Sequence, residues 1–101
     1  MIDITHDYLK IVLAVLVQYA PKYEVWAFGS RVGGKTKKHA DLDLVIKTDL
    51  PVPDGIMANL REAFSESNLP FKVDVVDWSK ISKNFQKIIK EKFEVIQKCE
   101  P

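Results

Sequence analysis

The sequence has 101 residues, of which 47% are hydrophobic and 29% charged, and its formal net charge is +1. These values predict one globular domain over residues 1–101, without the basic excess that proteins use to bind long nucleic acids. No apolar run reaches the roughly 18 residues of a membrane span, and the first residues lack the basic start of a secretion signal, so we expect a cytoplasmic protein. Cys99 is the only cysteine, which excludes an internal disulfide and a cysteine-based metal site.

The first half of the chain shows the pattern of a helix followed by two strands. Thr5 is a suitable N-cap for a helix whose apolar residues recur at helical spacing as far as Pro21. The segment "YEVWAF", residues 23–28, is rich in β-branched and aromatic residues and predicts a strand that stops at Gly29. The segment "DLDLVIK", residues 41–47, predicts a second strand whose aspartates and leucines point to opposite faces.

The second half continues with a helix, a strand and a further helix. Asp54 is a suitable N-cap for a helix that reaches Phe64, and "FKVDVVD", residues 71–77, predicts a third strand. Residues 85–89 predict a third helix, while "FEVIQK", residues 93–98, fits either an extension of that helix or a short strand. This order predicts an α/β (α+β) domain with a small mixed β-sheet flanked by helices.

Three aspartates are candidates for a metal site. Asp41 and Asp43 project from one face of the second predicted strand, about 7 Å apart at ~3.3 Å per residue. Asp74 lies between two valines of the third strand and would join them if the two strands are neighbours. Three converging carboxylates repel one another unless a cation is bound. Oxygen ligands favour Mg²⁺ or Mn²⁺, whose coordination is completed by water and substrate phosphates.

A Gly-Ser pair directly after the first predicted strand supplies the second part of the site. A strand that ends in Gly29 and Ser30 can expose successive N–H groups and a hydroxyl to an anion, which suits a triphosphate. The guanidinium of Arg31 fits either a phosphate contact or a surface ion pair. The lysine-rich residues 35–39 are interpreted as a solvated loop.

The spacing of these groups resembles that of the DNA polymerase β-like nucleotidyltransferases. Their signature is Gly-Ser, a spacer of about ten residues, and Asp-x-Asp or Glu. Here Gly29-Ser30 is followed by residues 31–40 and then by Asp41-Leu42-Asp43. By length, the chain is most similar to the minimal nucleotidyltransferases of bacteria and archaea.

The resemblance extends over about residues 5–97 and implies a polymerase β palm-like nucleotidyltransferase core. The residues that it implies for binding the phosphates of ATP are Gly29, Ser30 and Arg31. The residues that it implies for catalysis and for holding two Mg²⁺ or Mn²⁺ ions are Asp41, Asp43 and Asp74. In the family, the carboxylate at the position of Asp74 also helps to deprotonate the attacking hydroxyl.

Minimal nucleotidyltransferases are typically paired with a small helical HEPN-type protein in a toxin–antitoxin module. The resemblance therefore implies transfer of AMP from ATP to a hydroxyl, a tyrosine of a partner HEPN ribonuclease, with an antitoxin role for this chain. Two positions depart from the usual pattern: Gly33 stands where many members have arginine, and Ala40 where many have serine. The first departure keeps open an alternative, a catalytically weak or inactive nucleotide-binding subunit that neutralises its partner by docking alone.

For three further residues the sequence pattern indicates a structural role rather than a role in the active site. Asp77 lies on the opposite strand face from Asp74 and directly precedes "WSKIS", which favours a turn or helix cap. Trp26 and Phe28 are interpreted as core residues rather than as a platform for a nucleotide base.

Overall fold

The computed structural model describes residues 2–33 and 40–99. In chain order the elements are α1 (His6–Tyr19), β1 (Glu24–Phe28), α2 (Ser30–Gly33), β2 (Leu42–Lys47), α3 (Asp54–Ser65), β3 (Val73–Asp77), the 3₁₀ turn η1 (Trp78–Lys80), α4 (Lys83–Glu91) and β4 (Glu94–Gln97). None of the helices in the described ranges is long and apolar enough to cross a membrane.

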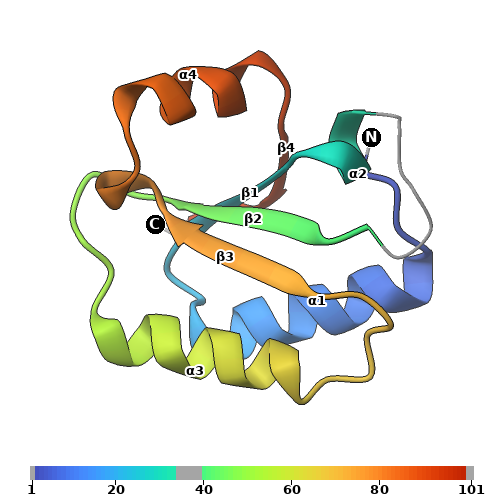
Figure 1. The fold of residues 1–101 in the computed structure, drawn as a ribbon. Helices are drawn as coiled ribbons and strands as arrows, with labels where there is room; N and C mark the ends of the chain where they lie inside the picture. Colours follow the sequence, from blue (N-terminus) through green and yellow to red (C-terminus); the bar gives the residue numbers. More distant parts are fainter. Residues whose placement is uncertain (1, 34–39, 100–101) are drawn as a thin grey trace.

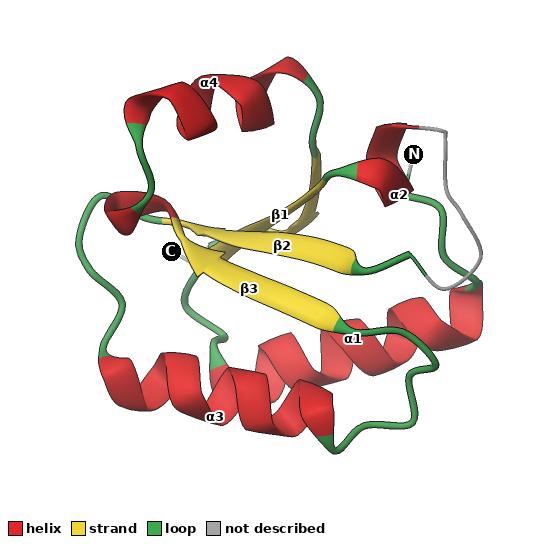
Figure 2. Ribbon diagram, viewed as in Figure 1, coloured by secondary structure: helices red, strands yellow, loops and turns green. Residues whose placement is uncertain are grey.

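A four-stranded sheet with helices on both faces forms the centre of the molecule (Figure 1). The strand order is β3-β2-β1-β4; β1 is antiparallel to both of its neighbours, whereas β2 and β3 are parallel. Helices α1 and α3 cover one face, and α4 lies over the other (Figure 2). The predicted α/β (α+β) class, a small mixed sheet flanked by helices, is therefore confirmed.

The start of α1 agrees with the sequence pattern. The Thr5 hydroxyl accepts a hydrogen bond from the N–H of Tyr8, so Thr5 is the N-cap of this helix, as predicted. Val12 and Leu16, one helical turn apart, are fully buried against the sheet. The cap thus fixes where the helix begins, and the apolar stripe fixes which face it buries.

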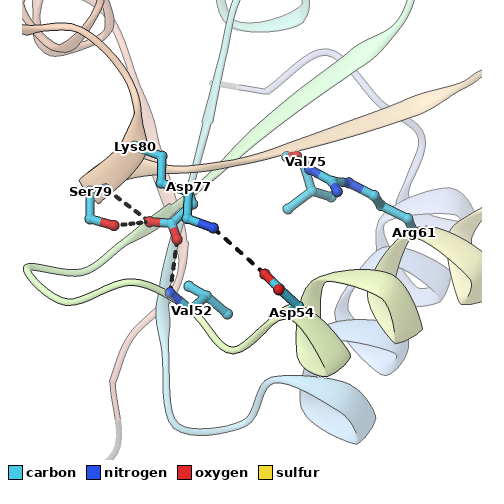
Figure 3. A network of polar contacts seen from close by, with 7 residues as sticks. All are labelled: Val52, Asp54, Arg61, Val75, Asp77, Ser79 and Lys80. Atoms are coloured by element: carbon cyan, nitrogen blue, oxygen red, sulfur yellow. Dashed lines mark hydrogen bonds and ion pairs between the residues drawn. The ribbon is translucent and has the colours of Figure 1, made fainter.

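The start of α3 differs from the prediction. Pro53 is the N-cap, and no side chain caps the helix. Asp54 is instead the first helical residue, and its carboxylate lies 3.7 Å from the ammonium of Lys80 (Figure 3). The prediction of an Asp54 cap was wrong because proline restricts φ before the helix, which moves the helix start one residue earlier than expected. The Asp54 charge still lies in the first turn, where the helix dipole favours it.

The segment that the sequence left open between helix and strand is a strand. Helix α4 ends at Glu91, and Lys92 has extended backbone angles. β4 then pairs antiparallel with β1. Phe93, between the two elements, stacks on Trp26 of β1 with ring centroids 4.0 Å apart. The free edge of β1 and this aromatic contact favour a strand here, and neither is visible in a local pattern.

Successive side chains of the central strands belong to two different hydrophobic cores, one on each face of the sheet. Leu42 and Leu44 of β2 are fully buried between the sheet and helices α1 and α3. The buried members of the second core, on the opposite face, are Trp26, Phe28, Val45, Trp78 and Ile89. Trp26 and Phe28 are therefore core residues, as predicted. Because Asp43 alternates with Leu42 and Leu44, its side chain lies on the face of this second core.

Candidate active site

The aspartates meet where β2 and β3 begin and β1 ends. Asp43 and Asp74 are register partners in the parallel pair β2–β3, and Asp43 lies opposite Phe28, the last residue of β1. Asp41 precedes β2 by one residue and is exposed. The second and third strands are thus neighbours, which was the condition for Asp74 to join the site, and Asp74 lies beside Asp43.

Gly29 packs directly against the Asp43 carboxylate. Its φ is +81°, which residues with a Cβ atom rarely adopt. A Cβ atom at this position would overlap Oδ2 of Asp43 and lie 3.2 Å from its Cγ. The glycine of the Gly-Ser pair and the second aspartate of Asp-x-Asp, fourteen positions apart in the sequence, therefore form one continuous surface.

A single helical turn, α2, follows Gly29. The N–H groups of Val32 and Gly33 both donate to the carbonyl of Gly29 at 3.0 Å, which closes helix α2. Gly29 and Ser30 are exposed. At Gly33, where many minimal nucleotidyltransferases have arginine, an added Cβ would meet no atom within 4 Å. The lysine-rich segment 35–39 lies outside the described residues.

Arg31 has a structural role that the sequence did not predict. The side chain is only 9% exposed. Its Nε donates to the carbonyl of Ala40 at 2.9 Å, its Nη1 donates to the carbonyl of Asp3 at 2.8 Å, and its guanidinium lies 4.2 Å from the ring centroid of Phe71. The surface ion pair considered from the sequence is wrong, because the side chain is buried on carbonyl groups. Arg31 instead fixes Ala40, the residue before Asp41, while its phosphate contact stays a prediction.

The electrostatics around Asp43 favour a bound cation. Burial raises the pKa of Asp43, and the negative charges of Asp74 and Asp41 raise this pKa further. Lys72 lies 3.4 Å from the Asp74 carboxylate but is itself largely exposed. A divalent cation would relieve the repulsion, and an all-oxygen set fits Mg²⁺ or Mn²⁺. Among the described residues, however, no three acidic, histidine or cysteine side chains are already arranged around a metal position.

A cleft of about 1020 Å³ opens beside the aspartates. Asp43 and Asp74 line it together with the rings of Phe28 and Phe85, which pack edge to face with centroids 5.7 Å apart. Its mixture of aromatic walls and a few convergent charges is typical of small-molecule sites, and its volume is sufficient for a nucleotide.

Asp77 belongs to a separate polar network beyond the cleft (Figure 3). Its carboxylate accepts hydrogen bonds from the N–H of Val52 at 2.8 Å and from the N–H and hydroxyl of Ser79 at 2.9 and 2.7 Å. Burial raises the pKa of Asp77, but these hydrogen bonds and the charge of Lys80 together lower it below its ordinary value. The predicted cap role is confirmed, since Asp77 caps η1.

Comparisons with known proteins identify the family of this chain. A family model described as a nucleotidyltransferase domain matches residues 9–96. A Haemophilus influenzae protein named probable protein adenylyltransferase MntA is 48% identical over 99 residues, which are 98% of this chain and 87% of that protein.

Solved structures share the fold at low sequence identity. A toxin–antitoxin crystal structure with AMP-PNP has a TM-score of 0.74 at 18% identity, covering 91% of this chain and 74% of that one. A tri-AMPylated Shewanella oneidensis HEPN toxin in complex with an MNT antitoxin has a TM-score of 0.57 at 18% identity, covering 87% and 67%. The match of the family model to most of the chain and the identity to MntA show that this protein belongs to the nucleotidyltransferase family, as one of its minimal members.

Proposed function

We propose that this protein is a metal-dependent adenylyltransferase that transfers AMP from ATP to a hydroxyl of a HEPN-type partner and so acts as an antitoxin. The observation that carries the proposal is the packing of Gly29 on Asp43, which joins the Gly-Ser turn and the aspartates in one site. The relative named probable protein adenylyltransferase, at 48% identity, supports protein as the acceptor. The fold match to an AMPylated HEPN toxin complex supports the kind of partner.

In the proposed reaction the acceptor hydroxyl attacks the α-phosphorus of ATP. A new phosphorus–oxygen bond forms, the bond between the α-phosphorus and the bridging oxygen to the β-phosphate breaks, and pyrophosphate leaves. The proton of the hydroxyl passes to the Asp74 carboxylate. Asp74 lines the cleft and lies beside Asp43 on β3, the edge strand. Gly29 and Ser30 hold the triphosphate, since they are exposed directly beside Asp43.

Two Mg²⁺ or Mn²⁺ ions would be held by Asp41, Asp43 and Asp74. When bound, such ions neutralise phosphate charge and align the attacking and leaving oxygens. The protein's own contribution is to hold the carboxylates in position. Asp43 is held against Gly29 on a central strand, and Arg31 fixes the chain immediately before Asp41 through its bond to Ala40.

The proposed acceptor is a tyrosine of the HEPN-type ribonuclease. An added AMP brings negative charge and bulk to a site that must bind RNA phosphates, and both oppose RNA binding. Covalent transfer therefore gives a physical route from the chemistry of this site to an antitoxin effect.

Intact-mass spectrometry tests the proposal. A HEPN-type partner, incubated with the protein, ATP and Mg²⁺, should gain the mass of one or more AMP groups. Asp43→Asn should abolish the gain, whereas Asp49→Asn, an exposed residue beyond the far end of β2, is the matched control and should retain it. Tight binding without any adduct would contradict the transferase and favour the alternative of inhibition by docking alone.

A further inference from the structure

Two neighbouring clefts lie along the free edge of β3, next to the aspartates, and are together called the groove below. β3 is an edge strand of the sheet, with β2 as its only neighbouring strand among the described residues, and it packs on α3 (Figure 2). The cleft that contains Asp43 and Asp74 is lined by residues 71–76 and by part of α3. A second cleft of about 370 Å³ continues along the strand to Asp77. Arg61 of α3 and Val76 of β3 line both clefts, so the two clefts are neighbours along the strand and the helix.

The main chain of β3 turns one row of hydrogen-bonding groups toward this groove. The N–H of Leu42 in β2 donates to the carbonyl of Lys72 at 2.9 Å, so the main-chain groups of Lys72 and Asp74 point toward β2. Main-chain groups alternate in direction along a strand. Those of Val73 and Val75 therefore point away from the sheet.

Arg61 confirms this direction and covers one position of the row. Its Nη2 donates to the carbonyl of Val75 at 3.1 Å (Figure 3), although Arg61 itself is exposed. Among the described residues none accepts a hydrogen bond from the outward N–H of Val73, which is half-buried, whereas Val75 is buried and its carbonyl is held by Arg61. Edge strands with open main-chain groups are templates for an added strand, and exposed charged side chains commonly restrict that pairing.

We infer that this groove binds an extended segment of the protein substrate, which adds to β3 as a further strand. The inference rests on the proposed function and states how the acceptor reaches the site. Side chains of an added strand alternate between the two faces of the sheet. Every second side chain would then stand beside Asp74, on the face where Asp43 also lies. A hydroxyl carried there meets the carboxylate that takes its proton, while Arg61 turns away to release the Val75 carbonyl.

Hydrogen exchange resolved by NMR at single amides tests the inference on the unmodified protein. In the free protein the N–H groups of Asp74 and Val76 should exchange slowly, because they lie in the ladder with β2, and the N–H of the half-buried Val73 should exchange faster. Adding a HEPN-type partner should slow the exchange of Val73 by about tenfold or more. The amides of β4, on the opposite edge, are the internal reference.

A pair of substitutions at Val73 separates its main chain from its side chain. Val73→Pro removes the outward N–H and keeps the ladder with β2, since proline is tolerated where an edge N–H faces outward. Val73→Ala keeps the N–H and is the matched control. The KM for the partner should rise about tenfold in Val73→Pro and about threefold or less in Val73→Ala. If Val73→Pro lowers the melting temperature too far for kinetics, the exchange experiment decides.

The outcomes separate this inference from the proposed function. Slower exchange at Val73 on complex formation, together with the difference between the two variants, supports strand addition. AMP transfer with unchanged exchange at the amide of Val73 overturns the inference and leaves the proposed function intact. Absence of both complex and transfer overturns the proposed function and the inference with it.

Discussion

Gly29→Ala tests whether the Gly-Ser turn and the aspartates act as one site. At a φ of +81° an L-residue costs about 1–2 kcal/mol more than glycine. The new Cβ would also overlap Oδ2 of Asp43, and forcing that carboxylate out of its rotamer adds about 1 kcal/mol. The reduced entropy of the unfolded chain returns about 0.5 kcal/mol. The expected net loss is about 2 kcal/mol of unfolding free energy.

A loss of this size is measurable by thermal unfolding. About 2 kcal/mol corresponds to a fall of roughly 8–16 °C in the melting temperature of a domain of this size. Gly33→Ala is the matched control, because a Cβ there meets open space and replaces glycine within a helical turn, so its change should stay within about 1 kcal/mol. AMP transfer should fall in Gly29→Ala, because the Asp43 carboxylate is displaced, and should persist in Gly33→Ala.

A double-mutant cycle separates the two parts of the penalty. Asp43→Ala removes the overlapping oxygen and leaves only a Cβ atom, 3.4 Å from the new methyl group, an ordinary contact distance. In that background Gly29→Ala should cost about 1 kcal/mol less, because only the backbone strain persists. An equal cost in both backgrounds, or a Gly29→Ala variant as stable as the parent, would refute the packing described for Gly29 and Asp43.

Three further outcomes follow from individual side chains. Burial and the charges of Asp74 and Asp41 raise the pKa of Asp43 above its ordinary value of 3.8, so the folded state loses stability as the pH rises above this value and Asp43 ionises. Asp43→Asn should therefore melt higher than the parent at pH 7 without metal, and it should lose most of the stabilisation that Mg²⁺ with ATP gives the parent, as followed by thermal shift. The pKa of Asp77 shifts in the opposite direction, because its hydrogen bonds lower it. Ionised Asp77 therefore stabilises the folded state above pH 3.8, and this stabilisation is lost as the pH falls through the pKa of the folded state. Asp77→Asn should cost about 1–3 kcal/mol at pH 7 and progressively less in acid, and a pH-independent difference in chemical denaturation would contradict this. Arg31→Lys should lose about 1–3 kcal/mol, because one ammonium cannot reproduce the two carbonyl contacts and the ring contact; unchanged denaturation would remove its positioning role.

Local patterns in the sequence were sufficient for most of the helices and strands and for the faces of the strands, but not for α2 or β4. Alternation in residues 41–47 placed Leu42 in the core and Asp43 on the opposite face, because side-chain direction in a strand has a fixed period of two. The caps at Thr5 and Asp77 were also predicted, since each uses a hydrogen bond to a main-chain N–H only two or three residues ahead. These features depend on residues within a few positions of one another along the chain, and these can be read from the sequence.

The assembly of the site was decided by contacts between distant parts of the chain. The parallel register that sets Asp74 beside Asp43 joins strands separated by α3, and the pairing of β4 needs the free edge of β1. The role of Arg31 is the clearest case, because its carbonyl partners and ring come from three segments that no local pattern connects. Burying a guanidinium without hydrogen-bond acceptors costs free energy, so the folded chain has to supply them. Which carbonyl groups lie close enough to do so depends on the tertiary structure.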